Sequence, residues 1–475
     1  MTSMAALFYI VSVTAYISFR KETLCKSKST SFRKYLSLFI SILSGLFSFL
    51  SKENTVVLPI TLLLTDYLFF FNLTDADRRD KIKRIYVFSF LFLLGLVAYF
   101  GTKPIFSYLN GYGHRNFTLT ERLLTEPRIV FFYLYLIIFP DVGLLTLNHD
   151  FPISKSITDP IQTLFALLAI VFLMATAYLL RKKYNLMSFV IVWYFGNLVI
   201  ESTIIPLELI FEHRTYLPGV LIFFMISFGI VYVSTHVLKK RKALLLTSLL
   251  LILYGNGTYL RNMIFRTPIS LWQDVVQKSP NLARAHANLG KAYMDYGYNS
   301  EARAAFEKAL RIKPDMTEPM LNLGKLYLNN FGMIDEAVVL FKKAQRLKSE
   351  GVFGCMGLGD AYMKAKDYRK AEHYYSVALK RRNFFVPAIN SLGIAKIYLG
   401  KKDEAVKLFK YGIMIDPTHA EFYFNLSKLY SNDKRYSDAI QILERYLSRN
   451  GDSKREKALL KEIKQKAQST SAFEK

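Results

Sequence analysis

Two groups of ionisable side chains stand where long apolar runs of this sequence end. The first group consists of Glu53, Glu201, Glu212, His213 and Arg214. The second, between residues 103 and 160, consists of Arg122, Arg128, His149 and Asp150. A carboxylate in such a set could act as a general base, and an arginine could hold a phosphate in bidentate fashion. The alternative is a set of ion pairs that hold loops to a helical bundle, and spacing alone favours this alternative.

The elements that position these groups are apolar helices. A run of about 17–25 apolar residues can cross a bilayer as a helix. The sequence has eight such runs, at approximately 4–19, 35–50, 55–71, 84–102, 161–180, 186–205, 217–238 and 243–260. Charges are confined to short clusters before residue 260 and recur at helical spacing after it. The pattern predicts an all-α protein with a membrane bundle at 1–260 and a second domain at 261–475.

The loop charges predict which side of the membrane each loop faces. Basic clusters follow the first, third, fifth and seventh spans, near residues 20–34, 78–84, 181–183 and 239–242, and such loops face the cytoplasm. Residues 129–147 have only a short apolar stretch before Pro140, which indicates an interfacial or re-entrant helix. We therefore expect one long extracytoplasmic loop at 103–160. The polar groups named above, Met1 and the second domain then face the same extracytoplasmic side.

The second domain carries internal repeats of 34 residues. The recurring element is Leu-Gly-x-x-Tyr followed by Ala, Phe and Ala at fixed offsets, which is the tetratricopeptide pattern. It occurs at Leu289-Gly290, Leu323-Gly324, Leu358-Gly359, Leu392-Gly393 (with Lys396 in place of the Tyr) and Leu426-Ser427. The second repeat runs one residue late after Asn329-Asn330. The pattern predicts an α-solenoid of about five repeats, a preceding half repeat at 268–280 and a charged capping helix at 453–468.

Such a solenoid binds proteins rather than catalysing a reaction, so we expect an acceptor or docking protein on it. Asparagines on the first helix of four repeats could contact the backbone of a bound peptide, with helix packing as the equal alternative: Asn288, Asn322, Asn390 and Asn425. The formal net charge is +26, yet no basic stripe interleaved with aromatic residues points to nucleic acid. No His/Cys cluster has the spacing of metal ligands, so the sequence predicts no metal site.

Four strings of the sequence carry a family resemblance. They are SKENTVVLPITLLLTDYLF (51–69), ERLLTEPRIVFFYLYLIIFP (121–140), LNHDFP (147–152) and ESTIIPLELIFEHRTYLP (201–218). Together with the repeats, they make the chain similar to bacterial relatives of the transmembrane and tetratricopeptide-repeat O-mannosyltransferases, which are GT-C glycosyltransferases. The resemblance implies a multi-pass protein of a bacterial inner membrane with a periplasmic repeat domain. It also implies a polyprenyl-phosphate-linked sugar as donor and Ser/Thr of a protein as acceptor, with no certain cofactor.

The resemblance assigns roles to some of the residues named above. Arg214 resembles the residue that contacts the lipid phosphate, with His213 and Glu212 beside it and Arg122 or Arg128 assisting. Glu53 is the candidate catalytic carboxylate, while Glu201, His149 and Asp150 resemble cavity residues. Met1 aligns with the start of the family's second span, so we expect the first span and its principal acidic motif to be absent from these residues. The alternative function is a non-catalytic membrane scaffold for protein interactions, whose solenoid docks envelope proteins.

Overall fold

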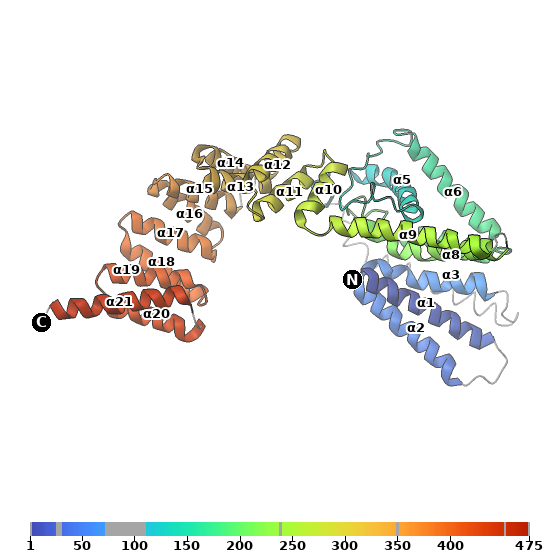
Figure 1. Cartoon of the computed structure of the whole chain (residues 1–475), viewed down its shortest axis with the longest axis horizontal. Coiled ribbons are helices and arrows are strands. Elements are labelled where there is room, and N and C mark those ends of the chain that lie inside the picture. Colours follow the sequence, from blue (N-terminus) through green and yellow to red (C-terminus); the bar gives the residue numbers. More distant parts are fainter. Residues whose placement is uncertain are drawn as a thin grey trace. The chain divides into compact units, whose positions relative to one another are not determined.

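The computed structural model describes residues 2–24, 31–71, 111–236, 240–347, 351–450 and 453–473. Within these ranges every regular element is a helix, and the chain divides into two compact units, 1–279 and 280–475. Figure 1 shows the helices of each unit along the chain. The predicted class is confirmed: apolar N-terminal helices precede a tetratricopeptide-repeat solenoid.

The first unit consists of long helices joined by turns. In chain order they are α1 (Thr2–Leu24), α2 (Ser31–Ser51), the 3₁₀ turn η1 (Glu53–Val57), α3 (Leu58–Phe69), η3 (Gly111–His114), α5 (Leu119–Ile138), α6 (Gln162–Leu180), α7 (Asn185–Leu198), η4 (Glu212–Thr215), α8 (Tyr216–His236), α9 (Lys240–Ile264) and α10 (Pro268–Lys278). The predicted domain boundary at residue 260 lies inside α9, and α10 belongs to this unit.

Four helices in the described residues are long and apolar enough to cross a membrane: Ser3–Leu24, Phe32–Ser51, Gln162–Leu180 and Glu212–Val233. Of the other predicted spans, 55–71 and 186–205 correspond to the shorter apolar helices Asn54–Phe69 and Asn185–Leu198. The predicted span at 243–260 lies within α9, and the one at 84–102 lies outside the described residues. The four helices support multi-pass membrane anchoring.

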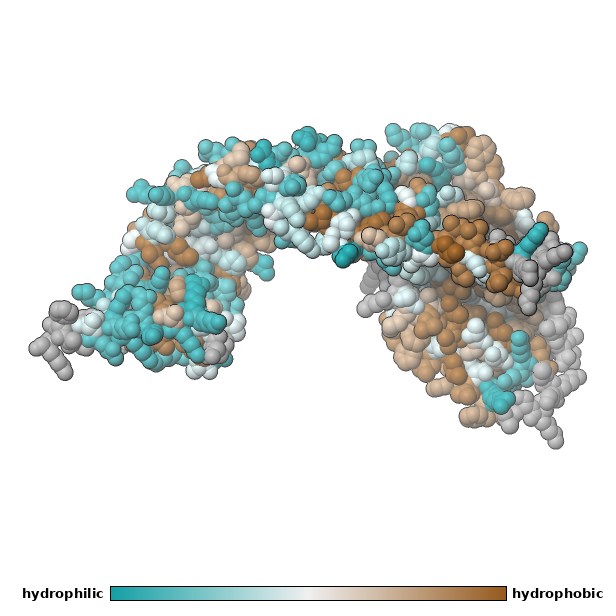
Figure 2. Space-filling view, viewed as in Figure 1, coloured by the Kyte–Doolittle hydropathy of each residue, from teal (hydrophilic) through white to brown (hydrophobic). Residues whose placement is uncertain are grey.

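Large apolar side chains point outward on this unit. Leu50, Phe172, Leu179 and Leu251 are each at least 70% exposed, and apolar surface covers much of the unit in Figure 2. Such a surface is costly in water and favourable in lipid. Inside, α1 and α2 pack through small polar residues: the Ser12 hydroxyl donates to the Ser41 carbonyl at 2.7 Å. Small residues allow the close approach that membrane helices use for association.

The second unit consists of antiparallel helix pairs. They are α11 (Ala283–Asp295) with α12 (Asn299–Ile312), α13 (Thr317–Leu326) with α14 (Ile334–Leu347), α15 (Val352–Lys364) with α16 (Tyr368–Arg381), α17 (Val386–Tyr398) with α18 (Lys402–Ile415), and α19 (Ala420–Asn432) with α20 (Tyr436–Asn450). The last helix, α21 (Lys454–Phe473), buries Leu459 and Ile463 against the final pair. It thus covers the end of the repeat core.

The Leu-Gly element has a steric cause. A β-carbon at Gly290 would lie 2.7 Å from the ring of Phe306, and one at Gly393 would lie 2.5 Å from the ring of Phe409. Glycine on the first helix of a pair therefore makes room for the aromatic ring of the second helix. Because both rings are fully buried, the helix pairs are locked by these contacts.

Two departures from the repeat pattern also have local explanations. The extra residue of the second repeat is absorbed by a π turn, η5 (Tyr327–Phe331), in which the hydrogen bonds span one more residue than in an α-helix. Lys396, in place of the expected tyrosine, lies 2.6 Å from a carboxylate oxygen of Glu372 and also pairs with Glu404. An ion pair between helices thus replaces an aromatic contact.

Candidate functional site

The carboxylate of Glu201 is the centre of a buried cluster in the first unit. Its Oε1 accepts hydrogen bonds from Lys52 Nζ at 2.9 Å and Asn54 Nδ2 at 3.0 Å. Its Oε2 lies 3.0 Å from Nε of Arg214. Lys52 and Asn54 flank the start of η1, whereas Glu201 follows α7 and Arg214 lies in η4. The turn at Lys52 and Asn54 therefore meets the distant segment 201–214 at one carboxylate.

Arg214 is buried and all of its guanidinium nitrogens are engaged. Besides the contact with Glu201, Nη1 donates to the Leu209 carbonyl at 2.9 Å and Nη2 donates to the Glu208 carbonyl at 2.8 Å. The side chain is 1% exposed. Arg214 therefore holds the turn before α8, and three of its five N–H groups are used by Glu201 and two backbone carbonyls.

Arg122 is fully buried in the same region. Its guanidinium donates to the carbonyls of Thr203, Leu207 and Glu201 at 2.6–2.8 Å. Its helix, α5, begins at a capping box in which Thr118 and Glu121 satisfy each other's backbone amides. This fixed start aims Arg122 at the segment after α7. These contacts correspond to the second of the two alternatives drawn from the sequence, a side chain that holds a loop to the bundle.

Glu126 lies one helical turn after Arg122, with a carboxylate oxygen 2.7 Å from the Arg122 guanidinium. Burial raises the pKa of Glu126 from 4.5 to about 7, against the opposing charges of Arg122 and Arg214. Between about pH 4.5 and 7 the unfolded chain ionises this carboxyl while the folded chain keeps its proton. The stability that Glu126 contributes is therefore fully present below about pH 4.5 and is lost as the pH rises through about 7.

We expect Glu126→Gln to flatten the pH dependence of unfolding of the first unit. In the unchanged protein this carboxyl lowers the thermal midpoint as the pH rises from about 5 to about 7.5. Glutamine does not titrate, so this part of the decline disappears. Tryptophan fluorescence measures it well, because both tryptophans, Trp193 and Trp272, lie in the first unit. Identical pH profiles for the two proteins would contradict the assignment.

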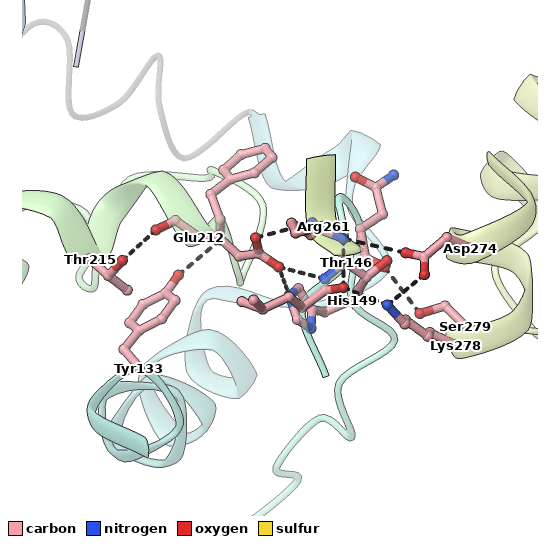
Figure 3. A network of polar contacts seen from close by, with 12 residues as sticks. Tyr133, Thr146, His149, Glu212, Thr215, Arg261, Asp274, Lys278 and Ser279 are labelled. Carbon is pink, nitrogen blue, oxygen red and sulfur yellow. Dashed lines mark hydrogen bonds and ion pairs between the residues drawn. The ribbon is translucent and has the colours of Figure 1, made fainter. Parts of the chain in front are cut away.

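A second cluster joins η4 and the loop after α5 to helix α10 (Figure 3). The carboxylate of Glu212 accepts from the Thr146 amide at 2.5 Å and from Arg261 Nη2 at 3.2 Å. Nε2 of His149 lies 3.5 Å from the same carboxylate. Arg261 also reaches Asp274 of α10 at 3.4 Å. The cluster therefore pins α9 and α10 to the loop that contains His149.

Helix α10 makes further contacts with that loop. Lys278 Nζ lies 2.6 Å from Asp274 and donates to the carbonyls of Val142 and Leu145 at 2.7 and 2.8 Å. The Ser279 hydroxyl donates to the Asn148 carbonyl at 3.1 Å and accepts from the Asp150 amide at 3.2 Å. The residues predicted as a half repeat thus serve as a brace for the polar loop.

The other predicted site residues lie at the edge of these clusters. Arg128 donates to the Pro152 carbonyl at 2.9 Å and the Ser154 hydroxyl at 3.1 Å. His213 is exposed and stacks on Phe211, with ring centroids 5.2 Å apart. The Asp150 side chain is exposed, and the side chain of Glu53 lies outside the described part of the structure.

The four asparagines of the solenoid are all half-buried on first helices. Asn425 Nδ2 donates to Oδ1 of Asn390 at 2.9 Å. These two therefore form a link between neighbouring repeats, which is the packing role that the sequence left open. The structure gives Asn288 and Asn322 no such link within the described residues.

The sequence already indicated Lys52 as a polar residue beside Glu53, but sequence reasoning missed four residues of the two clusters: Asn54, Arg261, Asp274 and Lys278. A signal existed for Asn54, because it follows Glu53 inside one of the strings that carry the resemblance. The other three lie on α9 and α10, in a stretch read as span and half repeat. Nothing in their spacing indicates that they meet the loop at 142–150.

An apolar groove lies beside the second cluster, between α9 and the end of α5. Its volume is about 590 Å³, within the range of ligand-binding cavities. Its apolar wall includes Ile138, Leu250, Leu253 and Tyr254, and Arg261 and Asn262 stand among its polar lining residues. Among the described residues, no three His, Cys, Asp or Glu side chains come together as a metal site.

The repeats match the tetratricopeptide repeat family at residues 283–316 and 397–463. Alignments with curated relatives cover longer stretches than these two repeat segments. Protein O-mannosyl-transferase TMTC2 of Homo sapiens is 32% identical over 134 residues, which is 25% of this chain and 16% of that protein. Protein O-mannosyl-transferase TMTC1 of Mus musculus is 26% identical over 241 residues, 48% of this chain and 25% of that protein. Protein O-mannosyl-transferase Tmtc3 of Drosophila melanogaster is 23% identical over 349 residues, 70% of this chain and 35% of that protein.

The chain is distantly similar to the protein O-mannosyl-transferases. The alignment with the Drosophila protein is longer than the repeat unit at 280–475, so it extends into the first unit. The chain spans about a third or less of the length of these relatives. Two solved structures are also similar. PilW, a type IV pilus biogenesis factor, is 20% identical, and the match covers 43% of this chain and 93% of that chain with a TM-score of 0.39. The tetratricopeptide-repeat protein YrrB is 21% identical, and the match covers 41% of this chain and 97% of that chain with a TM-score of 0.33.

Proposed function

We propose that this chain is a membrane glycosyltransferase-like protein that transfers a sugar from a polyprenyl-phosphate donor to Ser or Thr of an acceptor protein held by the repeats. One observation carries the proposal. Lys52, Arg122 and Arg214 come from three of the four strings that resemble the O-mannosyltransferases, and all three contact Glu201. His149, from the remaining string at 147–152, lies beside Glu212 of the string at 201–218. Strings that are separate in sequence thus meet in two polar clusters, and η4 contributes Arg214 to one and Glu212 to the other.

The surroundings of this region suit a lipid-linked donor. The apolar groove along α9 offers room for part of an isoprenoid chain. Its polar lining includes Asp141 and Arg261, and Arg261 is paired with Glu212 and Asp274. His213 and Lys52 stand nearer the surface than Arg214, and they are the groups that would contact the phosphate, with the Arg214 charge behind them. We assign the lipid-phosphate contact to these two residues.

The reaction is a displacement at the sugar. The acceptor hydroxyl oxygen bonds to the anomeric carbon, the bond to the phosphate oxygen breaks, and polyprenyl phosphate leaves. A carboxylate takes the hydroxyl proton, and Glu53 stays the candidate for that role. In keeping with the basic loops, the polar region and the repeats face away from the cytoplasm in this proposal.

A specific observation favours a second function, a non-catalytic membrane scaffold. Glu201, Arg122 and Arg214 satisfy one another or backbone carbonyls, so these buried charges already have a structural role without a substrate. In that case the solenoid alone would carry the function, by docking proteins at the membrane.

A donor-binding experiment separates the two. The purified full chain in lipid nanodiscs is titrated with polyprenyl-phosphate mannose, and transfer of labelled mannose to acceptor peptides rich in Ser and Thr is followed. We expect binding and transfer, and a roughly 10- to 100-fold loss of donor affinity in His213→Ala with Lys52→Ala, because the pair supplies one charge-assisted contact from Lys52 and one hydrogen bond from His213. His419→Ala, a partly exposed histidine of the solenoid, is the matched control. A folded chain that neither binds the donor nor transfers mannose would contradict the transferase proposal and favour the scaffold function.

A further inference from the structure

A separate pocket lies in the solenoid, on the second helices of the last two repeats. It has a volume of about 350 Å³ between α18 and α20. Its apolar lining includes Ile413, Met414, Pro417 and Ile442. Met414 is 70% exposed, which is unusual for so apolar a side chain. Its thioether chain is flexible, and such side chains suit surfaces that adapt to a partner.

Three cations surround this apolar lining: Lys410, Arg445 and Arg449. All three are exposed, and no carboxylate lines the pocket. Within the described part of the solenoid none of the three takes part in an ion pair. The nearest acid in sequence, Glu444, is paired instead with Lys464 of α21 at 2.7 Å. The pocket therefore combines an apolar floor with an unneutralised positive rim.

We propose that this pocket docks an acidic segment of a partner protein. One apolar side chain of that segment fills the space between Met414 and Ile442, and flanking carboxylates bind Lys410, Arg445 and Arg449. Charge complementarity argues for the acidic partner, because clustered arginines are the usual receptors of acidic motifs. The apolar floor argues for a peptide, since a free phosphate ion would use only the rim.

This surface is distinct from the asparagines on the first helices. Asn390 and Asn425 lie on α17 and α19, whereas the cations lie on α18 and α20. The docking role also does not depend on sugar transfer. A scaffold and an enzyme would both use the pocket to recruit an acidic partner, so failure of the transfer experiment leaves this proposal standing.

The test uses the full chain in nanodiscs of phosphatidylcholine and a fluorescent peptide with one leucine between four glutamates. We expect saturable binding by anisotropy, a loss of at least about tenfold in Arg445→Glu with Arg449→Glu, and a smaller loss in Met414→Ser. Lys308→Glu is the matched control. Lys308 follows Phe306 by two residues, as Arg445 follows Leu443, and it is likewise exposed.

Several outcomes would overturn the proposal. One is equal binding of a peptide in which glutamines replace the glutamates; another is equal binding by the Arg445→Glu, Arg449→Glu variant with unchanged circular dichroism. A third outcome has two parts: the peptide does not bind, and the nanodiscs float with phosphatidylglycerol vesicles. In this outcome the Arg445→Glu, Arg449→Glu variant no longer floats with the vesicles. That last result would assign the cations to an anionic lipid surface instead.

Discussion

Replacing Glu201 by alanine will lower the free energy of unfolding of the first unit by about 3–5 kcal/mol. The substitution removes the only carboxylate that the structure places on Arg214 within the described residues, while Arg214 stays buried with a side chain 1% exposed. Loss of one partner of a buried ion pair leaves the other charge without compensation, and the cost is of this size. Lys52 and Asn54 lose their acceptor at the same time.

Chemical denaturation in detergent, followed by tryptophan fluorescence, measures this effect on the first unit alone. Trp193 is buried in the bundle core, where its indole N–H donates to the Leu217 carbonyl at 2.9 Å. Glu208→Ala is the control, because Glu208 pairs with Arg115 but is 40% exposed, and such pairs contribute about 0–1 kcal/mol. Equal midpoints for the two variants would show that Glu201 is not the structural centre of the cluster.

Replacing Phe341 by alanine will destabilise the solenoid by about 3–5 kcal/mol and leave the tryptophan transition of the first unit in place. The ring is fully buried, and β-carbons at Gly324 and Gly357 would lie 2.7 and 2.5 Å from it. It therefore fills the space that two glycines on neighbouring first helices leave open. Deletion of such a ring leaves a cavity that rigid helix pairs close only in part.

The destabilisation of the solenoid by Phe341→Ala is measured by hydrogen exchange of the solenoid amides together with far-ultraviolet circular dichroism. Exchange should accelerate most in α13 to α15, because each repeat of a solenoid depends mainly on its neighbours. Phe353→Ala is the control: this phenylalanine is 54% exposed, and its loss should cost well under half as much. Uniform protection in Phe341→Ala would argue against the ring's role in joining the repeats.

The two results together bear on how the candidate site works. A strong structural effect of Glu201 would mean that the buried charges build the site, while chemistry takes place at its outer edge. There His213 is exposed and Lys52 is held by Glu201. If Glu201→Ala loses activity, the unfolding curves show whether the variant is still folded and so separate a lost catalytic role from a lost fold.

The sequence by itself determined most of the helices that the structure describes. Apolar runs indicate the membrane helices because a bilayer requires a fixed length of apolar residues. The glycine and aromatic spacing indicates the solenoid because each pair of helices must interlock at the same positions; even the late second repeat is visible in the sequence and emerges as the π turn at Tyr327–Phe331. These are local rules, and they act on residues close together in the chain.

Only the tertiary structure decided which polar residues meet. Lys52 and Glu201 are in contact although a large part of the first unit separates them in sequence, and no periodicity relates them. The roles of the arginines also depended on packing: Arg122, expected at a lipid phosphate, donates to three carbonyls because the capped start of α5 points it into the loop after α7. Contacts between distant segments follow from how helices pack against one another, and that arrangement is set by the whole bundle rather than by any string within it.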